Sequence, residues 1–277
     1  MMRAMLERDW LLGVARRERE ALGRTIQYTD PEAWENPGPW RGRPIADVLC
    51  HLAADEIASA ALYGGEGASE LQEWRKTAED PNAEAWIEWS TARRLEQHPV
   101  ATAIEWGGAA DLFIARAAET TLEDWTQKQV PWVAGDLKLG YLVQHRVVQW
   151  WLHGQDILEG GGQALRREHD PTFVVNDFAI KLLPYALSLA EIELPGKIAA
   201  VELEHVGAGK WVQSLDPGQT PAEGSTPHVM IEGFGPWFAL LATGRVSADQ
   251  VLYDGTVNVG GEVEAGEAIL RALRAFP

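Results

Sequence analysis

A run of two histidines and a glutamine, spaced four residues apart, is the part of this sequence best suited to chemistry. His145, Gln149 and His153 share one apolar segment, and His51 lies in another. In an α-helix, residues four apart lie on one face with Cβ atoms about 5–6 Å apart. Either His145 with Gln149 or Gln149 with His153 could therefore chelate a metal ion. The two histidines lie about 12 Å apart along a helix axis, so we expect only one of them to be a ligand.

A second helix could complete such a site. Bundle proteins build metal sites from side chains on facing helices, and His51 would add a third ligand to either pair. Three protein ligands leave one position open for water or substrate, as in catalytic zinc sites. The alternative is that each histidine is an ordinary polar residue of a helix, and spacing alone does not decide between the two.

The first half of the chain is predicted to consist of helices. Apolar residues recur there at three- and four-residue steps. The predicted helices cover residues 5–22, 45–52, 80–94, 99–120 and 137–159. Asp136 is the expected cap of the last one, and three glycines from Gly160 end it. Helices of this number and length predict an antiparallel four-helix bundle.

The second half is predicted to mix helices with strands. Residues 200–206 alternate apolar and polar, which is the period of a half-buried strand. The other strands are expected over 211–215, 228–231 and 257–259, and helices over 170–189 (kinked at Pro184), 237–242 and 262–276. This mixture predicts the α+β class. The glycine-rich stop and the charged run at 166–170 predict two domains, 1–164 and 165–277.

Two short segments carry a more specific pattern. The sequence Asn-Pro-Gly-Pro-Trp at 36–40 precedes Val-Leu-Cys-His-Leu at 48–52, and Arg146-x-x-Gln149-x-x-x-His153-x-x-Asp156 follows about a hundred residues later. Both segments resemble the signatures of the mycothiol-dependent maleylpyruvate isomerase family. The resemblance implies a DinB-like metal-binding four-helix bundle, followed by a smaller α+β domain of the sterol-carrier-like type.

The resemblance also implies a ligand set and a cofactor. It carries the metal ligands to His51, Gln149 and His153 and leaves His145 without a counterpart. The family typically has glutamate where this chain has Gln149. A carboxamide is neutral and a weaker ligand, so we expect lower metal affinity and a more acidic bound water. The alternative is that Gln149 marks a site that has lost its metal.

The expected reaction follows from the same resemblance. The metal is a divalent ion, zinc by preference, and the cosubstrate is mycothiol or a similar thiol. A metal-bound thiol is deprotonated and remains nucleophilic. This implies isomerisation or S-transfer on a small electrophilic substrate. A metal-free small-molecule binding protein and a metal-dependent hydrolase are the alternatives.

Three further residues are candidates for supporting roles. Asp55 lies one turn after His51, and Asp156 lies three residues after His153, so either carboxylate could orient an imidazole. The alternative for both is a solvated acidic face. Arg245 follows an apolar segment in a Gly-Arg pair similar to one in the family, and it could hold a substrate carboxylate. It could equally complement a helix dipole.

Composition restricts the partners. The 277 residues include 24 Lys and Arg against 41 Asp and Glu, a formal charge of −17. Such a surface repels phosphate backbones and anionic membranes, so we expect neither nucleic acid nor membrane as a partner. The one cysteine, Cys50, excludes an internal disulfide. We expect a cytoplasmic protein that is a monomer or a small homo-oligomer and binds a small molecule.

Overall fold

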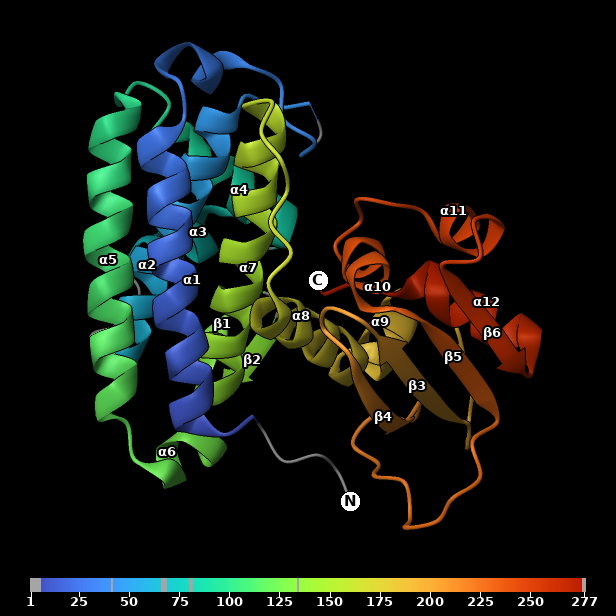
Figure 1. Ribbon diagram of the computed structural model, residues 1–277. Helices are drawn as coiled ribbons and strands as arrows, with labels where there is room; N and C mark the ends of the chain where they lie inside the picture. The colour runs from blue at the N-terminus through green and yellow to red at the C-terminus, as the bar shows by residue number, and fades with distance from the viewer. Residues whose placement is uncertain (1–5, 41, 66–68, 80–81, 134, 276–277) are drawn as a thin grey trace. The chain divides into compact units, whose positions relative to one another are not determined.

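The computed structural model describes residues 6–40, 42–65, 69–79, 82–133 and 135–275. These residues form two compact units, one that ends at Arg166 and one that begins at Arg167 (Figure 1). The first is built mainly of helices and the second contains a four-stranded sheet. The α+β class predicted from the sequence is confirmed.

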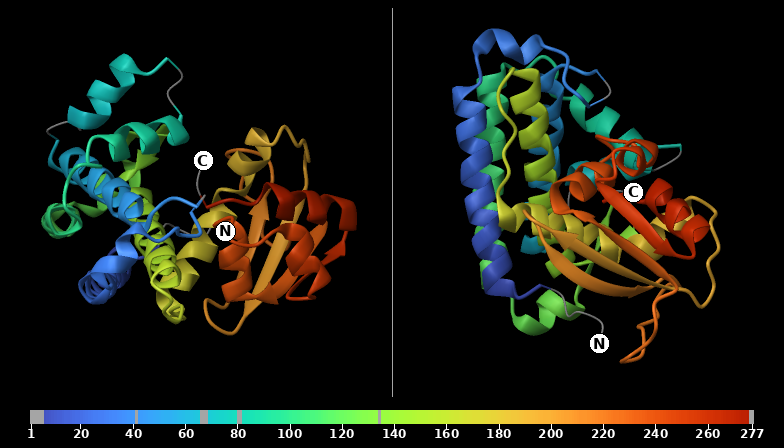
Figure 2. Two further views of the ribbon diagram at one scale, coloured as in Figure 1. Left: turned by 90° about the horizontal axis from the view of Figure 1, so that it is seen from above. Right: turned by 45° about the vertical axis from the view of Figure 1, so that its right-hand side comes forward.

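In the described part of the first unit, four helices of 20 or more residues form a bundle. They are α1 (Arg8–Tyr28), α2 (Ile45–Gly64), α5 (Pro99–Glu119) and α7 (Leu139–Gly160). Both α1 and α2 pack against α5 and α7, and Figure 2 shows the group from two further sides. The residues that α2 and α7 bury include polar and charged side chains as well as aliphatic ones. The bundle interior therefore contains a polar site.

Short elements connect these helices. They are η1 (Pro31–Glu35), α3 (Ser69–Thr77), α4 (Ala83–Ala92), α6 (Leu122–Gln127), β1 (Gln129–Trp132) and β2 (Gly135–Lys138). Neither α3 nor the antiparallel β1–β2 hairpin was predicted. The helix expected over 80–94 is α4, which Asn82 caps by accepting a hydrogen bond from Ala85 N at 3.0 Å. Asp80 and Pro81 lie outside the described residues.

The start of α7 corrects one prediction. Asp136 does not cap this helix, because it pairs with Pro131 within the hairpin and the cap position is Lys138. Gly135 makes the hairpin turn possible: its φ of 124° lies in a region that favours glycine. The far end follows the prediction, since α7 ends at Gly160 and Gly162 has a φ of 68°.

The second unit places helices beside a sheet with strand order β4-β3-β5-β6. The strands are β3 (Ile198–Glu204), β4 (Gly209–Ser214), β5 (Val229–Phe234) and β6 (Val257–Gly261), and β3 pairs parallel with β5 and antiparallel with β4. The helices are α8 (His169–Lys181), α9 (Leu183–Leu189), α10 (Gly235–Ala242), α11 (Ala248–Tyr253) and α12 (Val263–Ala272). Of these, α11 was not predicted.

The bend predicted at Pro184 lies between α8 and α9, which meet at 56°. Pro184 is in the first turn of α9, where a missing N–H is tolerated. No single helix of the described residues is long and apolar enough to cross a membrane. Taken together, α8 and α9 pass that test by length and composition, as a bent pair.

Candidate functional site

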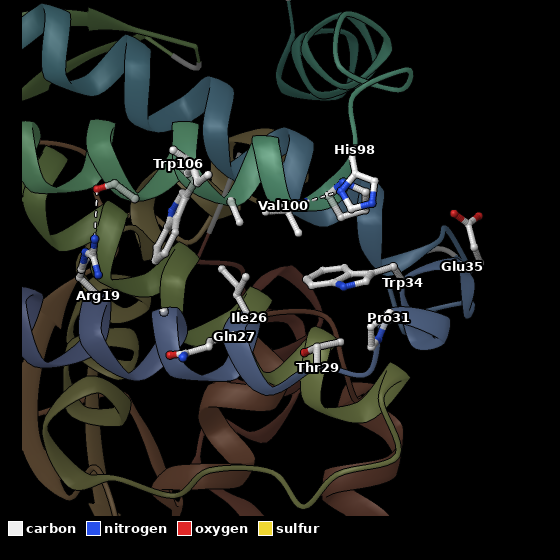
Figure 3. A pocket seen from close by; sticks show the side chains of 15 residues that line it. Arg19, Ile26, Gln27, Thr29, Pro31, Trp34, Glu35, His98, Val100 and Trp106 are labelled. Carbon is white, nitrogen blue, oxygen red and sulfur yellow. Dashed lines mark hydrogen bonds between the residues drawn. The ribbon is translucent and has the colours of Figure 1, made fainter.

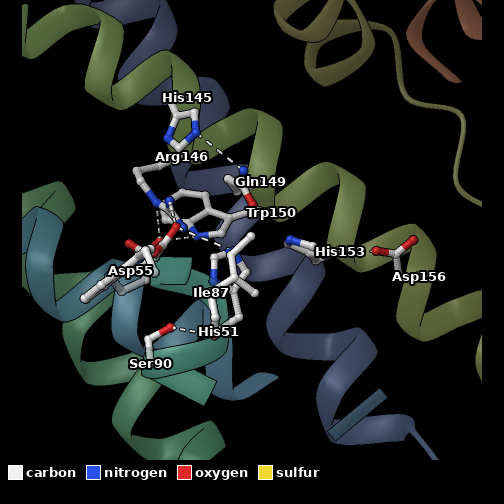
Figure 4. Close-up of polar contacts among 12 residues, drawn as sticks. His51, Asp55, Ile87, Ser90, His145, Arg146, Gln149, Trp150, His153 and Asp156 are labelled. Atoms are coloured by element: carbon white, nitrogen blue, oxygen red, sulfur yellow. Dashed lines mark hydrogen bonds and ion pairs between the residues drawn. The ribbon is translucent and has the colours of Figure 1, made fainter. Parts of the chain in front are cut away.

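The interior of the bundle brings His51 of α2 together with Gln149 and His153 of α7. All three side chains are buried. The two imidazole rings meet edge to face, with centroids 5.3 Å apart and planes at 84°. The hydrophobic stripes of α2 and α7 produce this approach, because each histidine lies among apolar residues that pack between the helices. Figure 4 shows the group with its polar neighbours.

A carboxylate lies beside each of these histidines. Asp156 Oδ2 is 2.9 Å from His153 Nδ1. Since a carboxylate only accepts hydrogen bonds, the Nδ1–H of His153 donates to Asp156, and Nε2 is the ring nitrogen that remains for a ligand. Asp55 Oδ2 is 3.7 Å from His51 Nε2, and His51 Nδ1 is buried with no hydrogen-bond partner among the described residues. Each ring thus has one nitrogen facing an acid and one available for a ligand.

Gln149 lies between the histidines of its own helix. Its Nε2 is 3.4 Å from His145 Nε2, while its Oε1 is buried and has no hydrogen-bond partner in the part of the chain described. Burial lowers the pKa of His51 to about 4, against the opposing effects of Asp55 and of the Gln149 side chain. A side-chain amide stabilises a charged imidazole through its oxygen, so this effect agrees with Oε1 facing His51.

One turn away, an ion cluster joins the same two helices. Arg146 of α7 is completely buried, and it donates from Nε to Glu56 and from Nη1 to Asp55, both at 2.6 Å. Trp86 of α4 donates to Asp55 at 2.7 Å, and Trp150 donates to Glu56 at 2.8 Å. Neither Arg146 nor Glu56 was predicted to be functional from the sequence. A charged residue within an apolar helical segment is the signal that points to such a cluster.

Burial and charge set the protonation of these groups. Burial would raise the pKa of Asp55, but His51, Arg146 and the Trp86 hydrogen bond together hold it at about 2. Burial outweighs Arg146 at Glu56 and raises its pKa. Burial also lowers the pKa of His145 to about 3. At neutral pH, His51 and His145 are therefore neutral, and Asp55 is charged.

Aromatic rings cover the histidines. The Trp40 ring stacks on His51 at 28° and meets His153 edge-on, with both centroid distances 5.7 Å. The Arg43 guanidinium lies 5.4 Å from the Trp40 centroid. Trp40 belongs to the Pro-Gly-Pro-Trp segment, so the structure places that motif against the histidines rather than in a remote loop. The Trp40 ring therefore covers one side of the histidine pair.

Arg245 and Cys50 each have contacts of their own. Arg245 follows α10 in the second unit, and its Nη1 donates to the Thr243 carbonyl at 3.0 Å, near the C-terminal end of that helix. This position suits a cation that complements the helix dipole, and a catalytic role for Arg245 stays a prediction. Cys50 is buried, and burial raises its pKa to about 11. It is a packing residue with a neutral thiol.

The donors of the site can be compared with what a metal requires. Within the described ranges, no cluster of three or more His, Cys, Asp or Glu side chains is placed to hold a metal ion. The set His51, Gln149 and His153 instead offers two imidazoles and an amide oxygen. Zinc accepts nitrogen and oxygen donors, and two buried lone pairs without partners are what an electropositive ligand would satisfy. The residues therefore fit a divalent ion with neutral ligands.

A cavity of about 660 Å³ lies on another side of the bundle. It is lined by residues of α1, η1 and α5, and Figure 3 shows the Trp34 and Trp106 rings along it. None of the residues of the histidine site lines this cavity.

The fold and the site together define a helical-bundle protein with imidazoles on facing helices and a second α+β unit. Residues 15–158 match the family model of the mycothiol maleylpyruvate isomerase N-terminal domain, and the chain belongs to this family. The resemblance found in the sequence is thereby confirmed.

Two solved structures share the fold. One is a crystal structure of the mycothiol-dependent maleylpyruvate isomerase, and the other is that of its variant with one histidine replaced by alanine. Each is 18% identical to this chain with a TM-score of 0.61, over 95% of this chain and 98% of the other. This likeness concerns the fold. No curated protein matches the chain significantly.

Proposed function

We propose that this protein is a thiol-dependent isomerase that uses a divalent metal, zinc by preference, in the bundle interior. The observation that carries the proposal is the buried pair His51 and His153, whose rings lie 5.3 Å apart beside the unpartnered oxygen of Gln149. Family membership supports the reaction class. The ligands would be His51, Gln149 and His153.

The residues around the site have separate tasks. Asp156 fixes the ring of His153 so that Nε2 faces the interior. Trp40 covers both imidazoles and keeps water away from them. A divalent ion bound to these donors would keep the thiol of mycothiol, or of a similar cosubstrate, deprotonated and nucleophilic.

The substrate class follows from the chemistry of a thiol. Isomerisation by a thiol requires reversible addition of sulfur to one carbon of a conjugated double bond. The S–C bond forms as the π bond breaks, the remaining single bond rotates, and the S–C bond then breaks to regenerate the thiol. A small unsaturated keto acid, of the maleylpyruvate kind, fits this reaction. Transfer of the sulfur compound onto the substrate is the related outcome if the adduct is stable.

Other parts of the proposal concern the whole protein. Arg245 is the candidate anchor for a substrate carboxylate, through paired hydrogen bonds. The acidic surface, with a formal charge of −17, supports a small molecule rather than nucleic acid or membrane as the partner. We propose a cytoplasmic location and a monomer or small homo-oligomer.

The test combines metal analysis with a thiol-dependent assay. Protein purified without a histidine tag is analysed for zinc, and conversion of maleylpyruvate is followed with mycothiol, with glutathione and without thiol. We expect one zinc per chain and conversion only with a thiol. His51→Gln and His153→Gln should lose both, while His169→Gln, at an exposed position, keeps both. Conversion without thiol would favour a hydrolase, and zinc-free protein that gains none on incubation would contradict the metal site.

A metal-free binding protein is the second candidate. Two features favour it: the neutral carboxamide at Gln149, and the finding that no cluster of three His, Cys, Asp or Glu among the described residues is placed to hold a metal ion. In that case Gln149→Glu should create zinc binding that the native chain does not have. If native and variant chains bind zinc alike, this candidate is rejected.

A further inference from the structure

Gln149 differs from a glutamate in that its two terminal atoms are not equivalent. A carboxylate presents an acceptor oxygen whichever way it turns, whereas a carboxamide presents either an acceptor or a donor. Only the oxygen can bind a cation. The usefulness of Gln149 therefore depends on which end faces the histidine pair, and something in the protein must select that end.

The structure contains a residue placed to make this selection. His145 lies one turn before Gln149 on α7, and its Nε2 is 3.4 Å from the amide nitrogen. Figure 4 shows this contact on one side of the amide, with the oxygen turned away from His145. The oxygen has no hydrogen-bond partner among the described residues, and neither has His51 Nδ1.

We propose that His145 is a positioning residue for Gln149. Its Nε2 accepts a hydrogen bond from the amide and so turns the amide oxygen toward His51 and His153. The inference deepens the proposed function and rests on it for its consequence, since this oxygen is one of the three proposed ligands. It also explains how a chain with glutamine in place of glutamate keeps an acceptor at that point.

The position of His145 is itself well defined. Its side chain is buried, and the Trp132 ring of β1 meets it edge to face at 5.7 Å. With Nε2 of His145 unprotonated, reversing the amide would replace this hydrogen bond with a contact between two acceptors, the amide oxygen and His145 Nε2. A buried donor or acceptor left without a partner costs about 1–3 kcal/mol, so the contact with His145 favours the orientation in which the amide nitrogen faces it.

The direct test is the tautomer of His145 in metal-free protein. We expect long-range ¹H–¹⁵N correlations to show Nε2 without a proton and Nδ1 with one. One of the two Gln149 side-chain amide protons should be protected from exchange, and this protection should disappear in His145→Phe. A proton on Nε2 would instead require the amide oxygen to face His145, and it would overturn the proposal. This readout needs neither metal nor activity.

The second test measures zinc affinity by calorimetry in a double-mutant cycle. His145→Phe keeps a ring against Trp132 but removes the acceptor. Loss of a residue that orients a ligand typically weakens metal binding 10–100-fold, and we expect a loss of that size. In the Gln149→Glu background, His145→Phe should change affinity less than about twofold, because a carboxylate needs no orientation. His145→Gln, which restores an acceptor, should recover most of the native affinity.

The outcomes separate the two proposals. A purely structural role of His145 would reduce affinity equally in both backgrounds, and equal losses would overturn the positioning role. Thermal melting of each variant identifies any general loss of folding. If the native chain binds no zinc but His145 has the expected tautomer, the metal part of the proposed function fails and the positioning role stands.

Discussion

Two neighbouring regions of the bundle interior bury polar side chains in different ways. Around Arg146, opposite charges meet at 2.6 Å, and each of the two carboxylates also receives a tryptophan N–H. Arg146 Nη2 and Glu56 Oε2 have no hydrogen-bond partner among the described residues, but every charged group of this cluster makes at least one short hydrogen bond. Around His51 and His153, the His51 ring is neutral, and two buried atoms, His51 Nδ1 and Gln149 Oε1, have no partner within the described residues. Both regions lie between α2 and α7.

The difference separates structure from function. Buried charges that are paired and hydrogen-bonded specify how two helices meet, and the Arg146 cluster does this for α2 and α7. Buried lone pairs without partners cost stability, and a ligand bound between the histidines would satisfy those of His51 and Gln149. Asp55 joins the regions, because it binds Arg146 and also lies 3.7 Å from His51. The charged cluster thus holds the neutral one in place.

Removing the cation of the charged cluster should have the largest effect. Arg146→Met leaves two buried carboxylates without their partner, and breaking a buried ion pair in this way costs about 3–5 kcal/mol. Urea unfolding followed by circular dichroism measures the change.

The matched control is Asp111→Asn, which breaks the exposed pair with Arg19 and should cost no more than about 1 kcal/mol. If both variants lose the same stability, the buried cluster does not hold the helices together and the comparison fails.

The second largest effect should be a loss of folding stability in acid, caused by the buried histidines. His51 and His145 have folded pKa values of about 4 and 3, below the ordinary value of 6.5. The unfolded chain therefore takes up protons first, and the stability that these neutral rings contribute above pH 6.5 is lost as pH falls toward 4. Each contributes a slope of about 1.4 kcal/mol per pH unit, or about 2 kcal/mol between pH 6.5 and 5.

Urea unfolding at several pH values, with a chelator present, checks this slope. His145→Asn should remove the share of one histidine and make the dependence shallower, and His169→Asn controls for loss of an exposed histidine. An unchanged slope in His145→Asn would show that this ring titrates alike in the folded and unfolded chains.

A smaller effect distinguishes paired from unpaired indoles. Trp86→Phe removes the donor to Asp55, which should cost about 1.5 kcal/mol beyond the loss of ring volume. Trp125→Phe loses the same volume, but its buried N–H has no partner in the part of the chain described. The difference between the two free energies of unfolding measures the bond. A difference near zero would remove Trp86 from the cluster.

Much of this fold could be predicted because its helices and strands follow periodic patterns of apolar residues. The helical period of apolar residues predicted the bundle helices, alternation predicted β3, and the other three strands of the second unit were expected from short apolar segments near turn residues. The β1–β2 hairpin was missed because its strands have four residues each and one contains Pro131. Asp136 before an apolar helix looks like a cap, yet it pairs in the ladder with Pro131. The pairing of such short strands depends on the turn that joins them rather than on a periodic pattern of apolar residues.

The site could be predicted only in part. Spacing on α7 could not choose between His145 and His153, and the family resemblance made that choice. Which residues of α2 face α7 depends on how the two helices are rotated and shifted against each other. The contacts of Arg146 with Asp55 and Glu56 follow from that arrangement, so no pattern within either helix could show them.

The smallest expected effect tests the edge of the neutral region. Cys50 adjoins His51 in sequence, but consecutive helical residues point about 100° apart, and its thiol interacts with Thr102 of α5. Burial raises its pKa to about 11, so at pH 7 it is not the thiolate that zinc binds. Cys50→Ala should cost about 1 kcal/mol of stability and leave zinc affinity within about twofold in a calorimetric titration. Under the proposal, His51→Gln loses zinc binding. If Cys50→Ala also lost zinc binding, residues on two faces of α2 would contribute to the site, and the site would extend beyond the histidine pair.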